Sequence, residues 1–575
     1  MISSDIFTDP SLYTRDVLSF CTTDVVGIRQ WLEQLPTSQL GDTSKLLFNA
    51  LIEISELNIE AEVKFNMMQV LHLPIEQVLV FFTQNVMDEI PFTSHHHENI
   101  LDLIQQFRCY IIRIYSDVVL NIHLKTSDSK LPFCFAKKQR KFRKLRALSS
   151  YLALEQLSLL KRHQLTLYKE SLMGQWQMTH TLFRSALKHK YHQINIKSCQ
   201  PQFAHSQNNV TNIASLYKQI TLLDILNTQQ VRPNEIYALY QCSFEWVSYI
   251  QFSLKETLYT RYFIDLTVDA PPRLQQFHTQ ERHKLCIYME INPLLQHINL
   301  ANLPGDKNLS ATEKKYLSPS LIFHLLNTLN YPSERRYQRY NFSSSIQITF
   351  GLDNAYHYLT NSKAFKLVVK KNEKFDLLMT DQYQAVYTRP KELPRLYQCN
   401  ILDISVNGYR MHWTKNTAPV GLHVEEFILV QENNQSPWRG GAIRWIKQLP
   451  NDQVEFGVEI LSQELIPCRV TDDQSDQKTS NDYAALLIRK QDLLNEPSFS
   501  IIVPNSKIFQ ENKNIDVNLN AQAIKIYLTT AKLVNHGFAQ FNFKVLNAED
   551  QKILNSFISQ YAKSRNNLDL WDGLK

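Results

Sequence analysis

The most informative stretch of the chain runs from residue 398 to residue 413 and reads QCNILDISVNGYRMHW. Its two halves, Gln398–Ile404 and Tyr409–Trp413, alternate apolar and polar side chains, which is the period of a half-buried β-strand. Between them, Asp403 and Ser405 precede Gly408, at a place where a tight turn needs glycine. The stretch therefore predicts a β-hairpin with a polar turn.

Further candidate strands lie on both sides of this hairpin. Short alternating segments with turn signals between them predict a small antiparallel barrel at 332–465. Residues 351–397 have mixed character, and we predict an insertion there, with a helix and a hairpin on the rim of the barrel. The other candidate strands are Ser344–Phe350, Val424–Gln431, Gly441–Lys447 and Val454–Leu461.

The residues before the barrel predict a long helical domain at 1–325. Only four of the twelve glycines lie in residues 1–350, whereas six lie in 351–457, and helices avoid glycine. Apolar residues recur at helical spacing, as in Leu47, Leu51 and Ile54. Similar stretches run through 148–188, 212–228, 233–265 and 318–330, whereas proline and charge interrupt the pattern between Leu131 and Arg146.

The residues after the barrel predict a smaller domain. The stretch 470–481 is almost wholly polar, so it cannot offset its ordering entropy by burial, and we expect a linker or loop. Residues 482–575 then predict a β-rich domain, with strands at 498–504, 515–519, 524–529 and 538–546 and a closing helix at 548–562. The fold class is thus multidomain α+β: a large all-helical N-terminal domain, an antiparallel barrel and a small C-terminal α+β domain.

Composition bounds the class of protein. The 575 residues are 44% hydrophobic and 20% charged, an ordinary globular balance, and the net charge of +6 is mild for this length. No apolar run of about 18 residues predicts a membrane span, and the start of the chain lacks the features of a signal peptide. The eight cysteines are scattered, as in a reducing compartment. We therefore expect a cytoplasmic protein.

Two motifs carry the functional signal. The pattern (Asp/Asn)-x-Ser-x-x-Gly occurs once, at Asp403–Gly408, against roughly 0.1 occurrences expected by chance. A carboxylate, a hydroxyl and a close backbone approach at glycine could clasp a planar ligand. Alternatively, Asp403 and Ser405 could simply bond their own backbone in a hairpin turn. The second motif, Arg335-Arg-Tyr-Gln-Arg339, could hold phosphate or guanine through its guanidinium groups, or could be a solvated basic run.

Together these motifs resemble the PilZ family of cyclic di-GMP receptors, in which R-x-x-x-R precedes a small barrel that carries (D/N)-x-S-x-x-G on its surface. The resemblance covers residues 332–462, and the segments Trp438–Trp445 and Glu455–Ile460 are similar to later strands of the family. It implies a receptor without a cofactor and without catalysis, in which the arginines hold phosphates and guanine edges and the turn surrounds a guanine. The ligand-binding residues that the resemblance implies are Arg335, Arg339, Asp403, Ser405 and Gly408. Within the same two motifs we also expect Arg336 and Asn407 to contribute, and Arg444 and Arg410 are candidate extra contacts.

Other clusters favour structural interpretations. The run Lys137–Arg146 has seven basic residues in ten and could bind nucleic acid, although a solvated helix face is the commoner fate of such a run. The residues His95–His97 predict a polar loop before a helix that opens at Glu98 rather than a metal site, because successive residues cannot all reach one ion. No nucleotide-loop, hydrolase or zinc-protease motif is present, and we expect neither catalytic residues nor a metal.

The sequence therefore predicts an effector that binds cyclic di-GMP, changes its domain arrangement and regulates motility, pilus function or biofilm and exopolysaccharide output. It would act through a protein partner, which we expect on the helical domain. Two alternatives remain open at this stage: a degenerate barrel that acts as a ligand-free interaction scaffold, or nucleic-acid binding through 137–146.

Overall fold

The computed structural model divides the chain into two compact units, Met1–Glu334 and Arg335–Lys575. Each unit is described by itself. The structure describes residues 6–7, 14–36, 39–86, 95–127, 135–199, 210–257, 259–275, 285–301, 309–330, 340–360, 395–405, 408–414, 418–419, 421–432, 436–449, 453–462, 464–472, 482–491, 497–519, 522–535 and 537–572.

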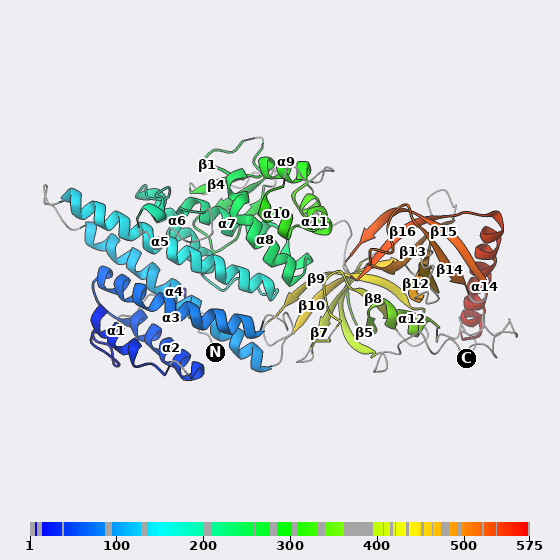
Figure 1. Ribbon diagram of the computed structural model, residues 1–575, viewed down its shortest axis with the longest axis horizontal. Helices are drawn as coiled ribbons and strands as arrows, with labels where there is room; N and C mark the ends of the chain where they lie inside the picture. Colours follow the sequence, from blue (N-terminus) through cyan, green and yellow to red (C-terminus); the bar gives the residue numbers. More distant parts are fainter. Residues whose placement is uncertain are drawn as a thin grey trace. The chain divides into compact units, whose positions relative to one another are not determined.

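The first unit is mainly helical, as the sequence predicts (Figure 1). Two of its helices begin where their side chains suggest. The carboxylate of Asp24 accepts from the backbone N–H of Gly27 at the start of the first helix, and Ser310 and Glu313 form a capping box at α10. The helices are α1 Val25–Glu33, α2 Leu40–Glu56, α3 Ala61–Val86, α4 His95–Ser127, α5 Phe135–Thr166, α6 Gln175–Lys188, α7 Ile213–Ile225, α8 Pro233–Trp246, α9 Asn292–Ala301, α10 Ala311–Tyr316 and α11 Pro319–Asn330.

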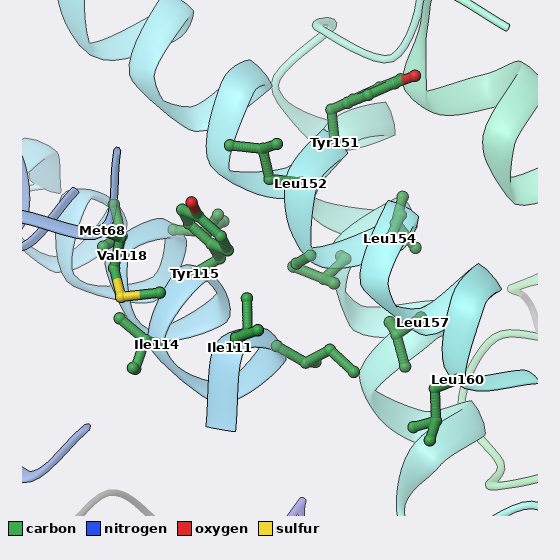
Figure 2. Close-up of a cluster of buried hydrophobic side chains, with 14 of the residues drawn as sticks. Met68, Ile111, Ile114, Tyr115, Val118, Tyr151, Leu152, Leu154, Leu157 and Leu160 are labelled. Atoms are coloured by element: carbon green, nitrogen blue, oxygen red, sulfur yellow. The ribbon is translucent and has the colours of Figure 1, made fainter. Parts of the chain in front are cut away.

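The centre of this unit is the packing of α3, α4 and α5. Figure 2 shows Met68 of α3 among side chains of α4, including Tyr115, and side chains of α5, including Leu157, all nearly inaccessible to solvent. One ion pair lies inside this packing: Lys64 Nζ on α3 is 2.7 Å from Asp117 Oδ2 on α4, and their side chains are 1% and 5% exposed. Such a pair is stable only because each charge compensates the other.

In helix α3, the segment Ala61–Gln84 is long and apolar enough to cross a membrane by length and composition. This finding differs from the expectation that no stretch of the chain is apolar enough to span a membrane. In the structure its apolar side chains, among them Phe65, Leu71 and Leu79, belong to the core that α3 shares with α4 and α5. A core helix of this kind meets the same length and composition criteria as a membrane span.

Two helix starts differ from the prediction. Helix α4 begins at His95 rather than Glu98, so the histidines expected in a loop open the helix. Helix α5 begins at Phe135, so the basic run lies in a helix rather than interrupting one. Part of that run is engaged with protein: Lys141 Nζ is 2.6 Å from Glu62 Oε1, and Arg143 Nη2 donates to the carbonyl of Lys190 at 2.5 Å.

The prediction of an all-helical N-terminal domain is wrong in one region. The strands β1 Gln251–Ser253, β2 Tyr262–Asp265, β3 Arg273–Leu274 and β4 Cys286–Glu290 form a four-stranded sheet in the order β1-β4-β2-β3. The first two of these strands lie in the stretch 233–265 that we expected to be helical. Strands of two to five residues are too short to establish an alternating pattern, so the helical spacing of α8 dominates the sequence signal there.

The second unit begins with the predicted barrel. Its strands are β5 Tyr340–Phe350, β6 Tyr397–Ser405, β7 Gly408–Trp413, β8 Phe427–Gln431, β9 Arg439–Gln448 and β10 Val454–Ser462. They close in the order β10-β7-β6-β5-β8-β9, and every neighbouring pair is antiparallel (Figure 1). Each predicted strand corresponds to an observed one, because alternation marks the inner and outer faces of the barrel wall.

The predicted insertion leaves the barrel after β5. Helix α12, Leu352–Thr360, follows Gly351, whose φ of +87° is in the left-handed region that favours glycine. The helix at the start of the insertion is thus confirmed. The hairpin predicted for the rest of 351–397 lies largely outside the described residues.

The C-terminal region is a second closed barrel. Its strands are β11 Leu465–Asp472, β12 Asp482–Gln491, β13 Pro497–Pro504, β14 Asn514–Leu519, β15 Gln522–Val534 and β16 Phe538–Val545, followed by α14 Ala548–Asp572. The polar stretch 470–481 does not separate domains, because Thr471 of β11 pairs with Asp482 of β12. Its first residues belong to β11, and the second barrel already begins at Leu465.

Candidate functional site

The polar motif lies on the hairpin of β6 and β7. Asp403 and Ser405 are in β6, Gly408 opens β7, and Ser405 pairs directly with Gly408 across the turn. The hydroxyl of Ser405 donates to the carbonyl of Gly408 at 3.4 Å, which is a long contact. Ser405 therefore bonds its own hairpin, as the structural interpretation expects, whereas the carboxylate of Asp403 reaches a side chain of the next strand.

That side chain is Arg410 of β7, which stands between two carboxylates. Its Nη2 is 2.7 Å and its Nε 3.2 Å from Oε2 of Glu455 on β10, and its Nη1 is 3.5 Å from Oδ2 of Asp403. Both acids are largely buried, whereas the Arg410 side chain is 37% exposed. The hydrogen bonds that Arg410 donates to Glu455, together with the negative charges of Glu455 and Asp403, raise the pKa of Arg410 above its usual value.

Arg444 is linked to the same surface through a neighbour. It lies on β9, and its Nε is 2.5 Å from Oε2 of Glu459 on β10. Glu459 in turn pairs with Gly408 across the β10–β7 ladder. The structure thus gathers Asp403, Ser405, Gly408 and Arg444 onto adjoining strands of the barrel wall.

The remaining predicted residues, Arg335, Arg336, Arg339 and Asn407, lie outside the described residues. The neighbouring register is nevertheless defined. Strand β5 begins at Tyr340, one position after Arg339, and Asn341 is the cross-strand partner of Asp403. The chain that follows the arginine motif therefore enters the barrel opposite the acidic residue of the second motif.

Two glycines allow strands to approach closely here. A Cβ on Gly408 would stand 2.2 Å from the carbonyl oxygen of Val458 on β10. A Cβ on Gly457 would stand 2.0 Å from Nε1 of Trp445, so the indole of Trp445 packs against the bare backbone of β10. Glycine is needed at both places because the space for a side chain is already occupied.

Replacing Gly457 with alanine is expected to displace the Trp445 indole and to lower the free energy of unfolding by about 1–3 kcal/mol, the usual cost of overpacking. The measurement is denaturant unfolding together with tryptophan fluorescence. Gly41→Ala is the matched control, since a Cβ at Gly41 meets nothing within 4 Å and alanine favours a helix. Equal stability of Gly457→Ala and the wild type would contradict this packing.

The sequence does not point to Glu455 as a site residue, and it marks Arg410 only as a candidate extra contact. In the sequence, Glu455 belongs only to a predicted strand. No local pattern marks it, because its role depends on β10 lying beside β7, and this pairing brings together residues 45 positions apart. Among the described residues, no group of three or more His, Cys, Asp or Glu side chains is placed to hold a metal ion.

Two family models match successive parts of the chain. Residues 26–257 match the family model described as the N-terminal domain of the cyclic-di-GMP receptor FimW. Residues 262–386 and 378–467 match the model described as the middle PilZ domain of that receptor. The chain therefore contains a PilZ domain, and the first barrel, β5–β10, lies within the residues that this model matches.

A curated relative extends the similarity beyond that barrel. The chain is 20% identical over 578 aligned positions to the cyclic-di-GMP receptor FimW of Pseudomonas aeruginosa strain PAO1, covering 92% of each protein. The similarity therefore includes the helical unit and most of the second barrel. No solved structure matches the chain.

Proposed function

We propose that the protein is a cyclic di-GMP-binding effector whose ligand lies on the β6–β7 hairpin of the PilZ barrel. The observation that carries this proposal is the pairing of Asn341 with Asp403. Arg339 and Asp403 are 64 positions apart, yet the arginine motif runs directly into the strand that faces Asp403. The insertion begins only after β5, so the extra residues of this gap come after the strand that pairs with Asp403.

The chemistry of the two motifs is complementary to this ligand. The carboxylate of Asp403 can accept hydrogen bonds from the N1–H and the amino group of a guanine, and Gly408 lets the ring approach the backbone. The guanidinium groups of Arg335 and Arg339 suit the two phosphates and the O6/N7 edge of guanine. Without those arginines, the described part of the site holds three acids, Asp403, Glu455 and Glu459, against Arg410 and Arg444. The arginine motif is thus needed to bind a dianion.

The same proposal includes the effect of ligand binding on the rest of the protein. Binding draws the arginine segment onto the hairpin and changes the arrangement of the helical unit and the barrels, because only a ligand that prefers one arrangement can shift the equilibrium. The protein acts in the cytoplasm, without catalysis and without a cofactor. It regulates motility, pilus function or biofilm and exopolysaccharide output through a protein partner of the helical unit. The name of the Pseudomonas relative supports the ligand.

Calorimetric titration of cyclic di-GMP into the full chain tests the proposal. We expect saturable binding, with cyclic di-AMP at least tenfold weaker, because adenine has no N1–H to give to Asp403. Arg339→Ala should weaken binding by about 2 kcal/mol or more, since it removes a charge-assisted contact to phosphate. Arg273→Ala is the matched control, because Arg273 is an exposed arginine in the sheet of the helical unit.

The alternatives give different results. If the wild type binds neither dinucleotide, the barrel is a scaffold and the proposal is wrong. If the chain instead binds nucleic acid with a steep salt dependence that Arg339→Ala leaves unchanged, the basic run 137–146 is the functional surface.

A further inference from the structure

The two barrels have the same strand order. Numbering the strands of each barrel from one to six along the chain, the neighbours in the PilZ barrel are 1–2, 2–3, 3–6, 6–5, 5–4 and 4–1. The neighbours in the C-terminal barrel are the same six pairs. All twelve pairings are antiparallel. A six-stranded barrel can be closed in many orders, so this agreement is specific.

The connections also correspond. In each barrel the segment that joins the third and fourth strands buries an apolar side chain. That side chain is Leu422 between β7 and β8, fully buried, and Phe509 between β13 and β14, 2% exposed. The C-terminal barrel is thus a second barrel of the PilZ topology, although the middle-domain family model ends at residue 467.

The second barrel has no ligand motif at the corresponding positions. The segment between its second and third strands has the sequence Asp492-Leu-Leu-Asn-Glu496, without serine or glycine. The chain before its first strand, 459–464, has no arginine. The pattern (Asp/Asn)-x-Ser-x-x-Gly occurs only at Asp403 in the whole chain.

The outer wall of the second barrel is apolar where the first barrel covers it. In β12, Ala485 and Leu487 belong to the inner core, whereas the alternate residues Leu486 and Ile488 belong to another buried cluster. That second cluster takes alternate residues of β13 and β16 as well, Ile502 and Phe538, all fully buried. A barrel wall exposed to water would carry polar residues at these positions.

The first barrel supplies the other half of this cluster. Phe427 and Leu429 of β8 contribute to it, and the ring of Phe427 meets that of Phe538 edge to face with centroids 5.5 Å apart. Gly440 of β9 completes the fit, since a Cβ there would stand 2.9 Å from Phe427 and 2.8 Å from Leu465. Buried aromatic pairs of this geometry stabilise an interface beyond the area they bury.

Helix α12, the described part of the insertion, lies against both barrels. Its residues Leu352, Ala355 and Leu359 belong to the shared cluster. Its Tyr356 hydroxyl accepts from Nε of Arg469 on β11 at 3.1 Å, and the guanidinium lies over the Tyr356 ring. In the chain, α12 follows β5 and precedes β6, the two strands that lead from one ligand motif to the other.

We infer that the C-terminal barrel is a ligand-free copy of the PilZ barrel, and that it is the docking partner of the face formed by β8, β9 and α12. The two barrels form one cooperative pair, in which the insertion anchors the ligand-binding barrel to its copy. The insertion therefore has a structural task that is separate from ligand contact.

Hydrogen exchange of the full chain, measured by peptide mass spectrometry without ligand, tests this pair. Phe538→Ala in β16 should lower the protection of β8 and α12 as well as β12 and β13, by roughly tenfold or more in each. Leu359→Ala in α12 should do the same and leaves both barrel cores intact. Phe557→Ala is the matched control, because Phe557 on α14 belongs to the inner cluster of the second barrel, and its loss should lower protection within that barrel and α14 but not in β8 or α12.

Two results would overturn the inference. Unchanged protection of β8 in both interface variants would mean that the barrels are independent domains. A cyclic di-GMP site that keeps wild-type affinity in the Asp403→Ala variant and is lost in the Phe538→Ala variant would place a ligand site in the second barrel. The exchange result does not depend on ligand binding, so a failure of the proposed function and a failure of the barrel pair are distinguishable.

Discussion

Asp403→Ala is expected to weaken the binding of cyclic di-GMP by about 2–5 kcal/mol, which is roughly thirtyfold or more in Kd. The substitution removes the acceptor that faces the guanine in the proposed site. It should leave the barrel folded, because Arg410 keeps its shorter contacts to Glu455, at 2.7 and 3.2 Å, when the 3.5 Å contact to Asp403 is lost. Calorimetric titration measures the affinity, and thermal unfolding checks the fold.

Asp516→Ala is the control for this experiment. Asp516 lies on β14 of the second barrel and pairs with Lys525 at 4.0 Å, so the same truncation falls in a barrel that lacks the motif. We expect wild-type affinity from this variant. Equal affinity of the Asp403 variant and the wild type would remove the β6–β7 hairpin from the binding site.

The second large effect concerns the helical unit. Lys64→Ala is expected to lower its free energy of unfolding by about 3–5 kcal/mol, because the buried Asp117 carboxylate would lose the ammonium group 2.7 Å away. Replacing both residues together, as Lys64→Met with Asp117→Leu, should restore most of the loss, because no uncompensated charge then remains inside. Denaturant unfolding monitored by circular dichroism at a helical wavelength measures the difference.

An exposed ion pair between α3 and α5 gives the comparison. Lys141 and Glu62 are 2.6 Å apart, but their side chains are 61% and 38% exposed. Lys141→Ala should therefore change stability by no more than about 1 kcal/mol. Similar losses from Lys64→Ala and Lys141→Ala would show that burial does not govern the strength of these pairs.

The sequence predicts the PilZ barrel well and its copy poorly, and the difference has a physical cause. Strands such as β6 and β7 face the core on one side and solvent on the other, so their residues alternate. Strand β12 is buried on both sides, and its run from Ala484 to Ile488 is continuously apolar. When both faces of a strand are buried, its residues no longer alternate between apolar and polar. The local sequence signal for a barrel strand is then missing.

The site shows a similar limit. The motif residues Asp403, Ser405 and Gly408 are close in sequence, and a pattern finds them. Glu455 contacts Arg410 only because β10 lies beside β7, and this neighbour relation is a property of the closed barrel. A local sequence pattern therefore cannot identify a contact residue that lies on a strand far away in the sequence.

The doubly buried wall of the second barrel also bears on how the chain avoids misfolding. A continuously apolar strand could shift its register by one residue against its neighbour and still bury apolar side chains on both faces. Between β13 and β16, which belong to this wall, the hydrogen bond from Gln540 Nε2 to Ser500 Oγ, 2.8 Å long between side chains 3% and 1% exposed, penalises such a slip. A chain in the wrong register would leave both polar groups buried without a hydrogen-bond partner, which costs about 1–3 kcal/mol of stability for each group. The Ser500–Gln540 pair thus favours one register of β13 against β16.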